Sequence, residues 1–332
     1  MNSFQTPGYE NLELSTQLVI AEALKRGIGV EVLDAQEPFI RLRKGEKVEY
    51  IRKANQTSAD TYITHFLLDN KQVCKQVLQE NGFSVPQGSS HTSIVEATKE
   101  AANWQGKACV IKPKSTNFGI GVSILEADHS PAQFQAALEH AFKEDAAVLI
   151  ERFLPGKECR FLVIGAECVA VLHRVPAHVV GDGSHSIEDL VKIKNEDPRR
   201  GKGYKTPLEF LELGPTELTV LEEQSLNTKN VLEYGKTAWL RHNSNISTGG
   251  DSIDYTDLVH PSYKEIALDA THALGAKICG VDIILQDPKA PANPENHGIL
   301  ELNWNPVLYF HDFPYEGENR HTAQHVLDLL GF

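Results

Sequence analysis

The most informative residues for chemistry lie on two apolar segments near the end of the sequence. Asp282 lies in GVDI, and Glu301 and Asn303 lie in ILELNWNP. Glu301 and Asn303 are two residues apart, so on a strand their side chains face the same side. Two carboxylates and an amide are hard oxygen ligands of the kind that Mg²⁺ prefers. The alternative is that a buried ion pair, to Arg174 or Arg241, satisfies these carboxylates.

A second feature is a lysine that ends an apolar run and precedes a glycine-bearing loop. In VIKPKSTNFGIGVSIL (residues 110–125), Lys112 is followed by Ser115, Gly119 and Gly121. Backbone N–H groups and hydroxyls of such a loop can enclose an anion while the lysine supplies positive charge, as phosphate-binding loops do. The spacing matches no nucleotide-binding motif of known mechanics, so a plain hairpin turn explains the stretch equally well.

Two further polar segments could bind a charged ligand or could be surface loops. The run RHNSNISTGGDS (residues 241–252) combines a guanidinium group, amides, hydroxyls and paired glycines, which let backbone N–H groups approach an anion. The run DPRRGKG (residues 197–203) is the most cationic loop, and we expect it to be a solvated surface loop. The 14 histidines and five cysteines show no H-E-x-x-H or C-x-x-C spacing, so a zinc site is not indicated.

Hydrophobic periodicity predicts the elements that position these segments. We expect helices at residues 16–27, with Ser15 as N-cap, and at 70–81, 93–104 and 262–274, with another beginning at 131. Strands are expected at 28–34, 38–42, 48–52, 108–112, 122–125, 147–153, 160–164, 168–174, 277–285 and 298–304. The stretch 175–240 is expected to contain turns and one short helix.

These elements predict an α+β chain with three parts. A short N-terminal α/β segment is expected at residues 1–88, a central unit at 89–155, and a C-terminal unit with the candidate metal ligands at 156–332. Pro155 and Gly156 follow Leu154 and interrupt both helix and strand, so we expect a hinge between the last two units there.

The composition of the chain narrows the class of protein. The 332 residues are 41% hydrophobic and 23% charged, with a formal net charge of -13, which is an ordinary globular composition. An acidic chain argues against nucleic acid as the main partner, because phosphate binding relies on a basic face. The sequence contains no secretory signal pattern and no apolar run of about 18 residues. We therefore expect a cytoplasmic protein that binds neither nucleic acid nor membranes.

The order of these motifs resembles that of ATP-grasp ligases. The motifs are Lys71, the Lys112 loop, ERFLPGKECRFLV, RVPA with GDG, RHNSNISTGG, GVDI and ELNWNP. More narrowly, LELSTQ, KPKSTNFGIGVSI, RVPAHVVGDG and NSNISTGG are similar to the glutathione synthetase module of bifunctional glutathione-synthesising enzymes, with cyanophycin synthetases the next most similar. The resemblance covers nearly the whole chain and implies two α+β subdomains that sandwich ATP. A glutamate-cysteine ligase module precedes this region in the bifunctional enzymes; 332 residues leave no room for it, so we expect that first reaction to be absent.

The resemblance also implies a role for individual residues. ATP would be bound by Lys71, Lys112, Ser115, Gly119, Gly121, Glu151, Phe153, Leu154 and Glu158, with Glu151 to Leu154 lining adenine and Glu158 accepting from the ribose. One or two Mg²⁺ or Mn²⁺ ions would be held by Asp282, Glu301 and Asn303. The tetrahedral oxyanion would be stabilised by Arg174, Arg241, Ser247 and Gly249. The loop at 115–121 would be ordered only when nucleotide is bound.

The activity implied is that of an ATP-dependent C–N ligase acting through an acyl phosphate. The resemblance favours γ-glutamylcysteine and glycine as substrates and glutathione as product. The alternatives are another peptide or amino-acid ligase resembling cyanophycin synthetase, and a non-catalytic ATP-binding protein. The substrates would be small molecules, and a homodimer is compatible with the resemblance.

Overall fold

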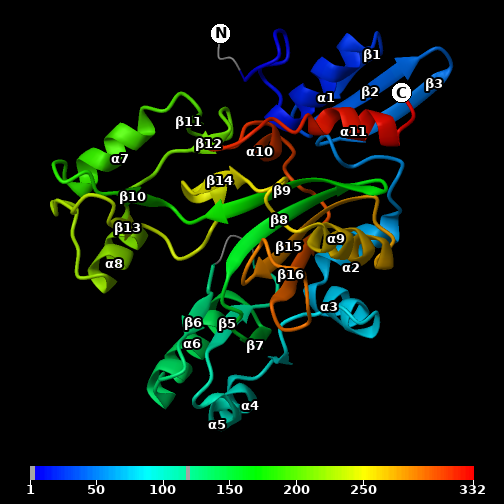
Figure 1. Cartoon of the computed structure of the whole chain (residues 1–332). Helices are drawn as coiled ribbons and strands as arrows, with labels where there is room; N and C mark the ends of the chain where they lie inside the picture. Colours follow the sequence, from blue (N-terminus) through cyan, green and yellow to red (C-terminus); the bar gives the residue numbers. More distant parts are fainter. Residues whose placement is uncertain (1–3, 117–119) are drawn as a thin grey trace.

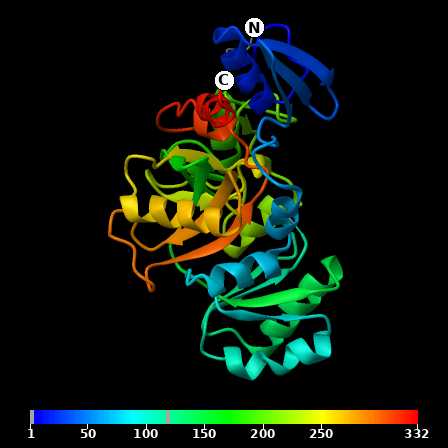
Figure 2. The ribbon, with the colours of Figure 1, turned by 90° about the vertical axis from the view of Figure 1, so that its right-hand side faces the viewer.

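The computed structural model describes residues 4–116 and 120–332. Figure 1 shows a central antiparallel sheet with one group of elements at each end and a third group projecting to one side. Figure 2, turned by 90°, shows that the molecule is elongated and that both chain ends lie at the same end of it. Among the helices in the described ranges, none is both long and apolar enough to span a bilayer.

The central sheet has five strands in the order β14-β9-β8-β15-β16, and all neighbours pair antiparallel. Its strands are β8 (Lys157–Ile164), β9 (Glu167–Val175), β14 (Asp251–Asp254), β15 (Ile278–Leu285) and β16 (His297–Asn303). Side chains of β8 alternate between two buried clusters, with Phe161 and Val163 on one face and Leu162 and Ile164 on the other. The sheet is therefore covered by a layer on each face.

Three helices cover one face of this sheet, and the N- and C-terminal segments cover the other. The first layer contains α2 (Tyr62–Asp69), α3 (Lys71–Glu80) and α9 (Pro261–Ala273). The second contains α1 (Leu14–Lys25), α10 (Tyr309–Asp312), α11 (Thr322–Leu329) and an antiparallel sheet of β1 (Gly29–Asp34), β2 (Phe39–Lys44) and β3 (Lys47–Arg52). Segments from both ends of the sequence thus share one core, which burial of apolar surface stabilises.

The start of α1 differs from the expectation. The N-cap is Glu13, whose carboxylate accepts from the N–H groups of Ser15 and Thr16, both at 3.0 Å. Ser15 is instead buried inside the helix, where its hydroxyl accepts from the N–H of Leu308 at 3.2 Å. A carboxylate at this end also interacts favourably with the helix dipole, so it replaces the hydroxyl cap.

A separate lobe, residues 88–152, lies below the central sheet in Figure 1; we call it the central lobe. It contains a four-stranded antiparallel sheet, β4-β7-β5-β6, packed on helices. The elements are β4 (Gly88–His91), α4 (Ile94–Lys99), α5 (Ala101–Trp104), β5 (Cys109–Pro113), β6 (Ser123–Leu125), α6 (Pro131–Glu144) and β7 (Val148–Arg152). The single helix expected at 93–104 is split, because the N–H of Glu100 bonds Ala97 and tightens the turn.

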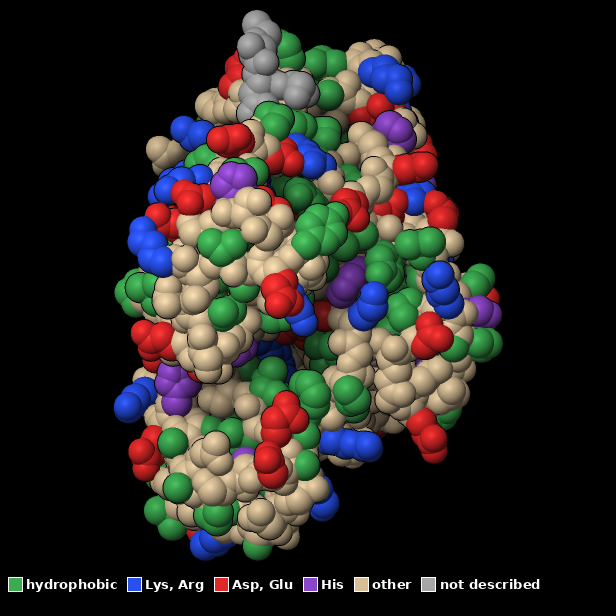
Figure 3. Space-filling view, turned by 60° about the vertical axis from the view of Figure 1, so that its left-hand side comes forward, with side chains coloured by type: hydrophobic (Ala, Val, Ile, Leu, Met, Phe, Trp, Pro, Cys, Tyr) green, Lys and Arg blue, Asp and Glu red, His purple; other side chains and the backbone are tan. Residues whose placement is uncertain are grey.

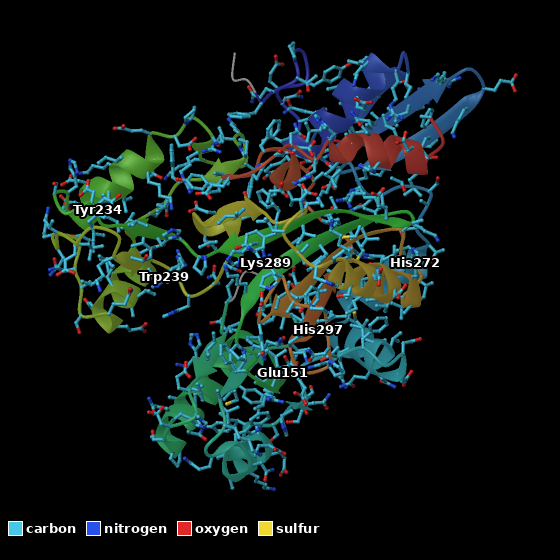
Figure 4. The ribbon with its side chains drawn as sticks, in the orientation of Figure 1. Glu151, Tyr234, Trp239, His272, Lys289 and His297 are labelled. Atoms are coloured by element: carbon cyan, nitrogen blue, oxygen red, sulfur yellow. The ribbon has the colours of Figure 1, made fainter. Side chains whose placement is uncertain are left out.

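The residues between β9 and β14 (176–250) form a compact unit that we call the insertion. The expectation of one short helix there is wrong, since the insertion has two helices, four short strands and its own buried cluster. Its elements are β10 (His178–Val180), α7 (Ile187–Asn195), β11 (Arg200–Gly201), β12 (Leu208–Glu209), α8 (Pro215–Glu223), β13 (Thr237–Trp239) and a 3-10 turn, η1 (Ile246–Thr248). Figure 4 shows Tyr234 and Trp239 on this unit, away from the central lobe.

Candidate functional site

The three candidate metal ligands meet on adjacent strands of the central sheet. Asp282 of β15 is paired directly with Glu301 of β16. The side-chain nitrogen of Asn303 lies 3.4 Å from Asp282 Oδ2 and 3.5 Å from Glu301 Oε1. The two-residue period of β16 thus brings all three side chains together, as the sequence pattern indicated.

Asp282 is also the centre of a buried ion-pair cluster. Its carboxylate accepts from Arg160 through both oxygens, with Nη2 to Oδ2 at 2.7 Å, and from Arg174 Nη2 at 3.0 Å. Burial alone raises the pKa of this carboxyl, but Arg160 and Arg174 outweigh burial and hold the pKa at about 2. The ion pair with Arg174 that the sequence left open is therefore present, whereas Arg241 pairs with Glu217 instead.

Arg160 is a site residue that sequence reasoning missed. It lies on β8, where the strand register places it directly beside Asp282 of β15. The available signal was a single arginine in the otherwise apolar run CRFLVI (residues 159–164), since a buried charge needs a partner. Its partner is more than a hundred residues away in sequence, so only the strand pairing identifies it.

A chain of polar contacts continues from Arg174 into the insertion. Glu158, the residue expected to accept from a ribose, accepts from Arg174 Nη2 and from the hydroxyl of Ser244. The central sheet is thereby linked to the loop that carries Ser247 and Gly249. The backbone of Gly249 has φ +89°, which favours glycine there.

The two candidate phosphate-binding lysines, Lys71 and Lys112, each lie close to a carboxylate. Lys71 Nζ is 3.5 Å from Glu301 Oε2 and donates to the carbonyl of Thr116 at 2.9 Å. Lys112 Nζ is 2.8 Å from Glu151 Oε2, and Lys75 Nζ is 2.5 Å from Glu151 Oε1. The structure therefore places Lys71, a loop carbonyl and the candidate metal ligand Glu301 in one place.

Lys75 is a second residue that sequence reasoning missed. Lys71 and Lys75 are four residues apart on α3, so they share one face of the helix. Both line a small pocket between α3 and β16 that also includes Leu300 and Glu301. The i, i+4 spacing in NKQVCK was the signal that could have found it.

Glu151 is buried between Lys75 and Lys112. Burial raises the pKa of its carboxyl, but the positive charges of Lys112 and Lys75 outweigh burial and leave the pKa below its ordinary value. Figure 4 shows Glu151 where the central lobe meets the central sheet. Figure 3 shows a hollow between the lobe and the rest of the molecule, with Lys or Arg side chains in it.

The residues that follow Glu151 run along this junction. The N–H of Phe153 bonds the carbonyl of Ala108 at 3.1 Å. The Leu154 side chain lies against Gly298 of β16, where an added Cβ would be 2.3 Å from Leu154 Cδ1. Phe153 and Leu154 therefore connect the lobe to the sheet, at the position expected for a hinge and an adenine-lining segment.

The loop after Lys112 joins two paired strands. β5 and β6 are antiparallel neighbours, so the stretch is a hairpin, which is compatible with a phosphate-binding loop. The N–H of Ser115 donates to Asp145 Oδ2 at 2.6 Å. Gly121 has φ +73°, and an added Cβ would lie 2.6 Å from Pro113 Cγ. Gly119 lies outside the described residues. The expectation that nucleotide orders this loop also concerns residues outside them and stays a prediction.

The second group of candidate catalytic residues borders a pocket in the insertion. The pocket has a volume of about 160 Å³ and is lined by Lys202, Glu209, Phe210, Glu212, Glu217, Arg241, Ser247 and Thr248. Arg241 Nε donates to Glu217 Oε1 at 2.6 Å. Arg241 and Ser247 thus line one pocket, and the role expected for them stays a prediction.

The cationic run at 197–203 is not a solvated loop throughout, which corrects the expectation. Arg200 is only 4% exposed, and it pairs with the buried Asp251. It also donates to the carbonyls of Glu209 at 2.8 Å and Gly249 at 3.3 Å. Lys194 Nζ reaches the same Asp251 at 2.6 Å, so two cations neutralise one carboxylate beneath the loop that carries Ser247.

The fold and the site define a class of protein. A family model described as an ATP-grasp-like domain matches residues 10–63, and one described as the C-terminus of D-ala D-ala ligase matches residues 77–185. A crystal structure of a bifunctional glutathione synthetase from Pasteurella multocida superposes with a TM-score of 0.80 and 44% identity, covering 99% of this chain and 45% of that chain. These matches show ATP-grasp domains in the chain, and the expected α+β ATP-grasp fold is confirmed.

Within this class, the chain is similar to one part of a known group of enzymes. The glutathione biosynthesis bifunctional protein of Clostridium perfringens is 52% identical over 327 residues, which are 98% of this chain and 42% of that protein. The corresponding protein of Enterococcus faecalis is 46% identical over 329 residues, which are 98% of this chain and 44% of that protein. The chain therefore spans less than half the length of these relatives.

Proposed function

We propose that this chain is an ATP-dependent C–N ligase that joins γ-glutamylcysteine to glycine, giving glutathione, ADP and phosphate. One observation carries the proposal: Lys71 lies 3.5 Å from Glu301 and 2.9 Å from the carbonyl of Thr116. A lysine, a candidate phosphate loop and a candidate metal ligand meet there, and phosphoryl transfer depends on such positioning and charge neutralisation. The similarity to bifunctional glutathione biosynthesis proteins supports the choice of substrates.

Divalent metal ions fit the residues present. Within the described ranges, no group of three or more His, Cys, Asp or Glu side chains is placed so that it could hold a metal ion. Asp282, Glu301 and Asn303 offer two carboxylates and an amide, which suits Mg²⁺ or Mn²⁺ completed by water and phosphate oxygens. One or two such ions would neutralise charge on the phosphates of ATP. Arg160 and Arg174 would hold the Asp282 carboxylate in its ionised form.

Two bond exchanges complete the proposed reaction. A carboxylate oxygen of the first substrate attacks the γ-phosphorus, the bond to the ADP oxygen breaks, and an acyl phosphate forms. The nitrogen of the amine then forms a bond to the acyl carbon, the carbon–oxygen bond to phosphate breaks, and phosphate leaves with that electron pair. The ammonium proton passes to phosphate or solvent.

The residues of this chain would bind and orient the reactants at each stage. Lys71, Lys75 and Lys112 would bind the phosphates of ATP, and Glu158 would accept from its ribose hydroxyls. Arg174, Arg241 and backbone N–H groups of the loop at 246–250 would stabilise the oxyanion that forms when the amine attacks. The central lobe and the loop at 114–121 would exclude water from the acyl phosphate.

A cytoplasmic location of the protein remains a prediction from the sequence.

The test is a screen of ADP release with carboxylate and amine pairs, followed by identification of the product by mass spectrometry. We expect γ-glutamylcysteine with glycine to release ADP and to give glutathione. Failure with that pair alongside turnover with amino acids and a peptide would favour a ligase resembling cyanophycin synthetase. ATP binding without ADP release for any pair would indicate a non-catalytic protein.

A further inference from the structure

The pocket in the insertion has no role yet in binding ATP or metal. We propose that it binds the amine substrate, a small zwitterionic amino acid such as glycine. This inference rests on the proposed function and adds a place for the second substrate. The insertion would then have a role in binding substrate, because Lys202, Phe210 and Glu212 line the pocket and belong to that unit.

A short chain of contacts links the pocket to the region where the amide bond would form. Arg241 and Ser247 line it. Ser244, which lies between them in sequence, donates to Glu158, and Glu158 also accepts from Arg174. An amine held in the pocket would therefore lie beside the groups proposed to stabilise the oxyanion, which is the position that the attacking nucleophile needs.

The pocket has room for a small amine substrate. Its volume of about 160 Å³ exceeds the roughly 10–15 Å³ that one water molecule requires on this measure, so several non-hydrogen atoms fit in it. Glycine has five non-hydrogen atoms, whereas γ-glutamylcysteine has about three times as many. Phe210 lines the pocket and would set the limit on the side chain of the bound amino acid.

The charged residues that line the pocket differ in whether other groups already bind them. Glu217 already binds Arg241, and Glu209 accepts from two backbone N–H groups of the turn before it. The remaining pair is Lys202 and Glu212, with Nζ and Oε1 3.2 Å apart and side chains 73% and 59% exposed. Only this pair, among the charged residues that line the pocket, is free of other ion-pair or hydrogen-bond partners in the described structure.

An exposed ion pair of this kind contributes little stability, so it can open at little cost. A zwitterion brings one charge of each sign and can replace both halves of the contact. Its carboxylate would bind Lys202, and its ammonium group would bind Glu212 before losing the proton that attack requires. The backbone contacts of Glu209 hold the turn without the Lys202 side chain, so substitution of Lys202 should leave the fold intact.

Steady-state kinetics with two amines test this assignment. In Lys202→Met and Glu212→Gln we expect the KM for glycine to rise at least about tenfold, as loss of a charge-assisted contact implies, while the KM values for ATP and γ-glutamylcysteine stay unchanged. Wild type should prefer glycine to glycinamide, which lacks the carboxylate, and Lys202→Met should lose that preference. Lys205→Met is the matched control, since Lys205 is exposed in the same turn and does not line the pocket.

Substitution of Phe210 tests the size limit. Phe210→Ala should raise the ratio of kcat/KM for alanine to that for glycine by about tenfold, the effect typical of one methylene group. Unchanged KM values for glycine in both charge variants, with the preference over glycinamide intact, would overturn the assignment.

A binding measurement separates this inference from the proposed function. Saturation-transfer NMR of glycine with ADP present needs no turnover. A glycine signal that weakens in Lys202→Met and Glu212→Gln supports the pocket even if no glutathione forms. An equal signal in wild type and both variants contradicts it.

Discussion

Lys112 Nζ lies 2.8 Å from Glu151 Oε2, and this contact joins the adjacent strands β5 and β7. Lys75 approaches the same carboxylate at 2.5 Å from α3. Two lysines and one carboxylate leave a net charge of +1 at the junction of the central lobe and the central sheet. The carboxylate thus holds two cations close together at a place where an anionic ligand such as ATP would be stabilised.

Lys112→Ala should weaken ATP binding by roughly ten- to a hundredfold, because a charge-assisted phosphate contact contributes about 1.5 to 3 kcal/mol. Isothermal titration calorimetry measures the affinity. Lys107→Ala serves as the control, since Lys107 is exposed and its ammonium group donates to the carbonyl of Asn103. Equal ATP affinity in wild type and Lys112→Ala would show that Lys112 holds Glu151 and does not bind phosphate.

The lowered pKa of Glu151 predicts a dependence of stability on pH. Because the pKa is lower in the folded chain than its ordinary value of 4.5, the carboxylate contributes stability above pH 4.5 and loses it as the pH falls through the folded value. Wild type should therefore be more stable than Glu151→Gln at pH 7, and the difference should shrink below pH 4.5. Melting temperatures of both proteins between about pH 3 and 7 test this. A difference that stays constant down to the lowest pH would contradict it.

The sequence predicted those parts of the site that depend on short spacings. Glu301 and Asn303 share a side because a strand has a period of two, and paired strands brought Asp282 to them. The partners of the buried charges could not be predicted, because they depend on strand register between distant segments, as with Arg160 and Asp282. A single sequence does not encode such a pairing in a readable pattern.

The helices and strands were likewise predictable where a local sequence pattern defines them and not where tertiary packing does. Four strands of the central sheet (β8, β9, β15 and β16) were predictable, because long apolar runs such as residues 277–285 indicate buried strands. The fifth strand, β14, has only four residues and was not predicted. The insertion was missed because its helices, α7 and α8, have nine residues each and its strands have two or three. Segments of two turns carry too few apolar positions to define a period, and their stability comes from tertiary packing.

Glu301→Gln should lower turnover at least about a hundredfold, since it removes one of two carboxylates proposed to bind the metal, a loss of several kcal/mol of charge stabilisation. The apparent affinity for Mg²⁺ should fall in the same variant. The measurement is ADP release as a function of Mg²⁺ concentration at saturating ATP. Glu295→Gln is a suitable control because Glu295 lies exposed in the loop before β16. Full turnover in Glu301→Gln would rule out Glu301 as a metal ligand.

Arg200→Met should destabilise the chain by about 3 kcal/mol, because removing one partner of a buried ion pair leaves an uncompensated charge. Arg200 is 4% exposed and Asp251 is 2% exposed, and Lys194 can neutralise Asp251 only in part. Urea denaturation measures the free energy of unfolding. The control is Arg41→Met, because the Arg41–Glu31 pair is far more exposed and should contribute no more than about 1 kcal/mol. Since Arg200 also donates to the carbonyl of Gly249, we expect turnover to fall in Arg200→Met even where it is fully folded. Equal denaturation midpoints for wild type and Arg200→Met would show that the pair does not stabilise the insertion.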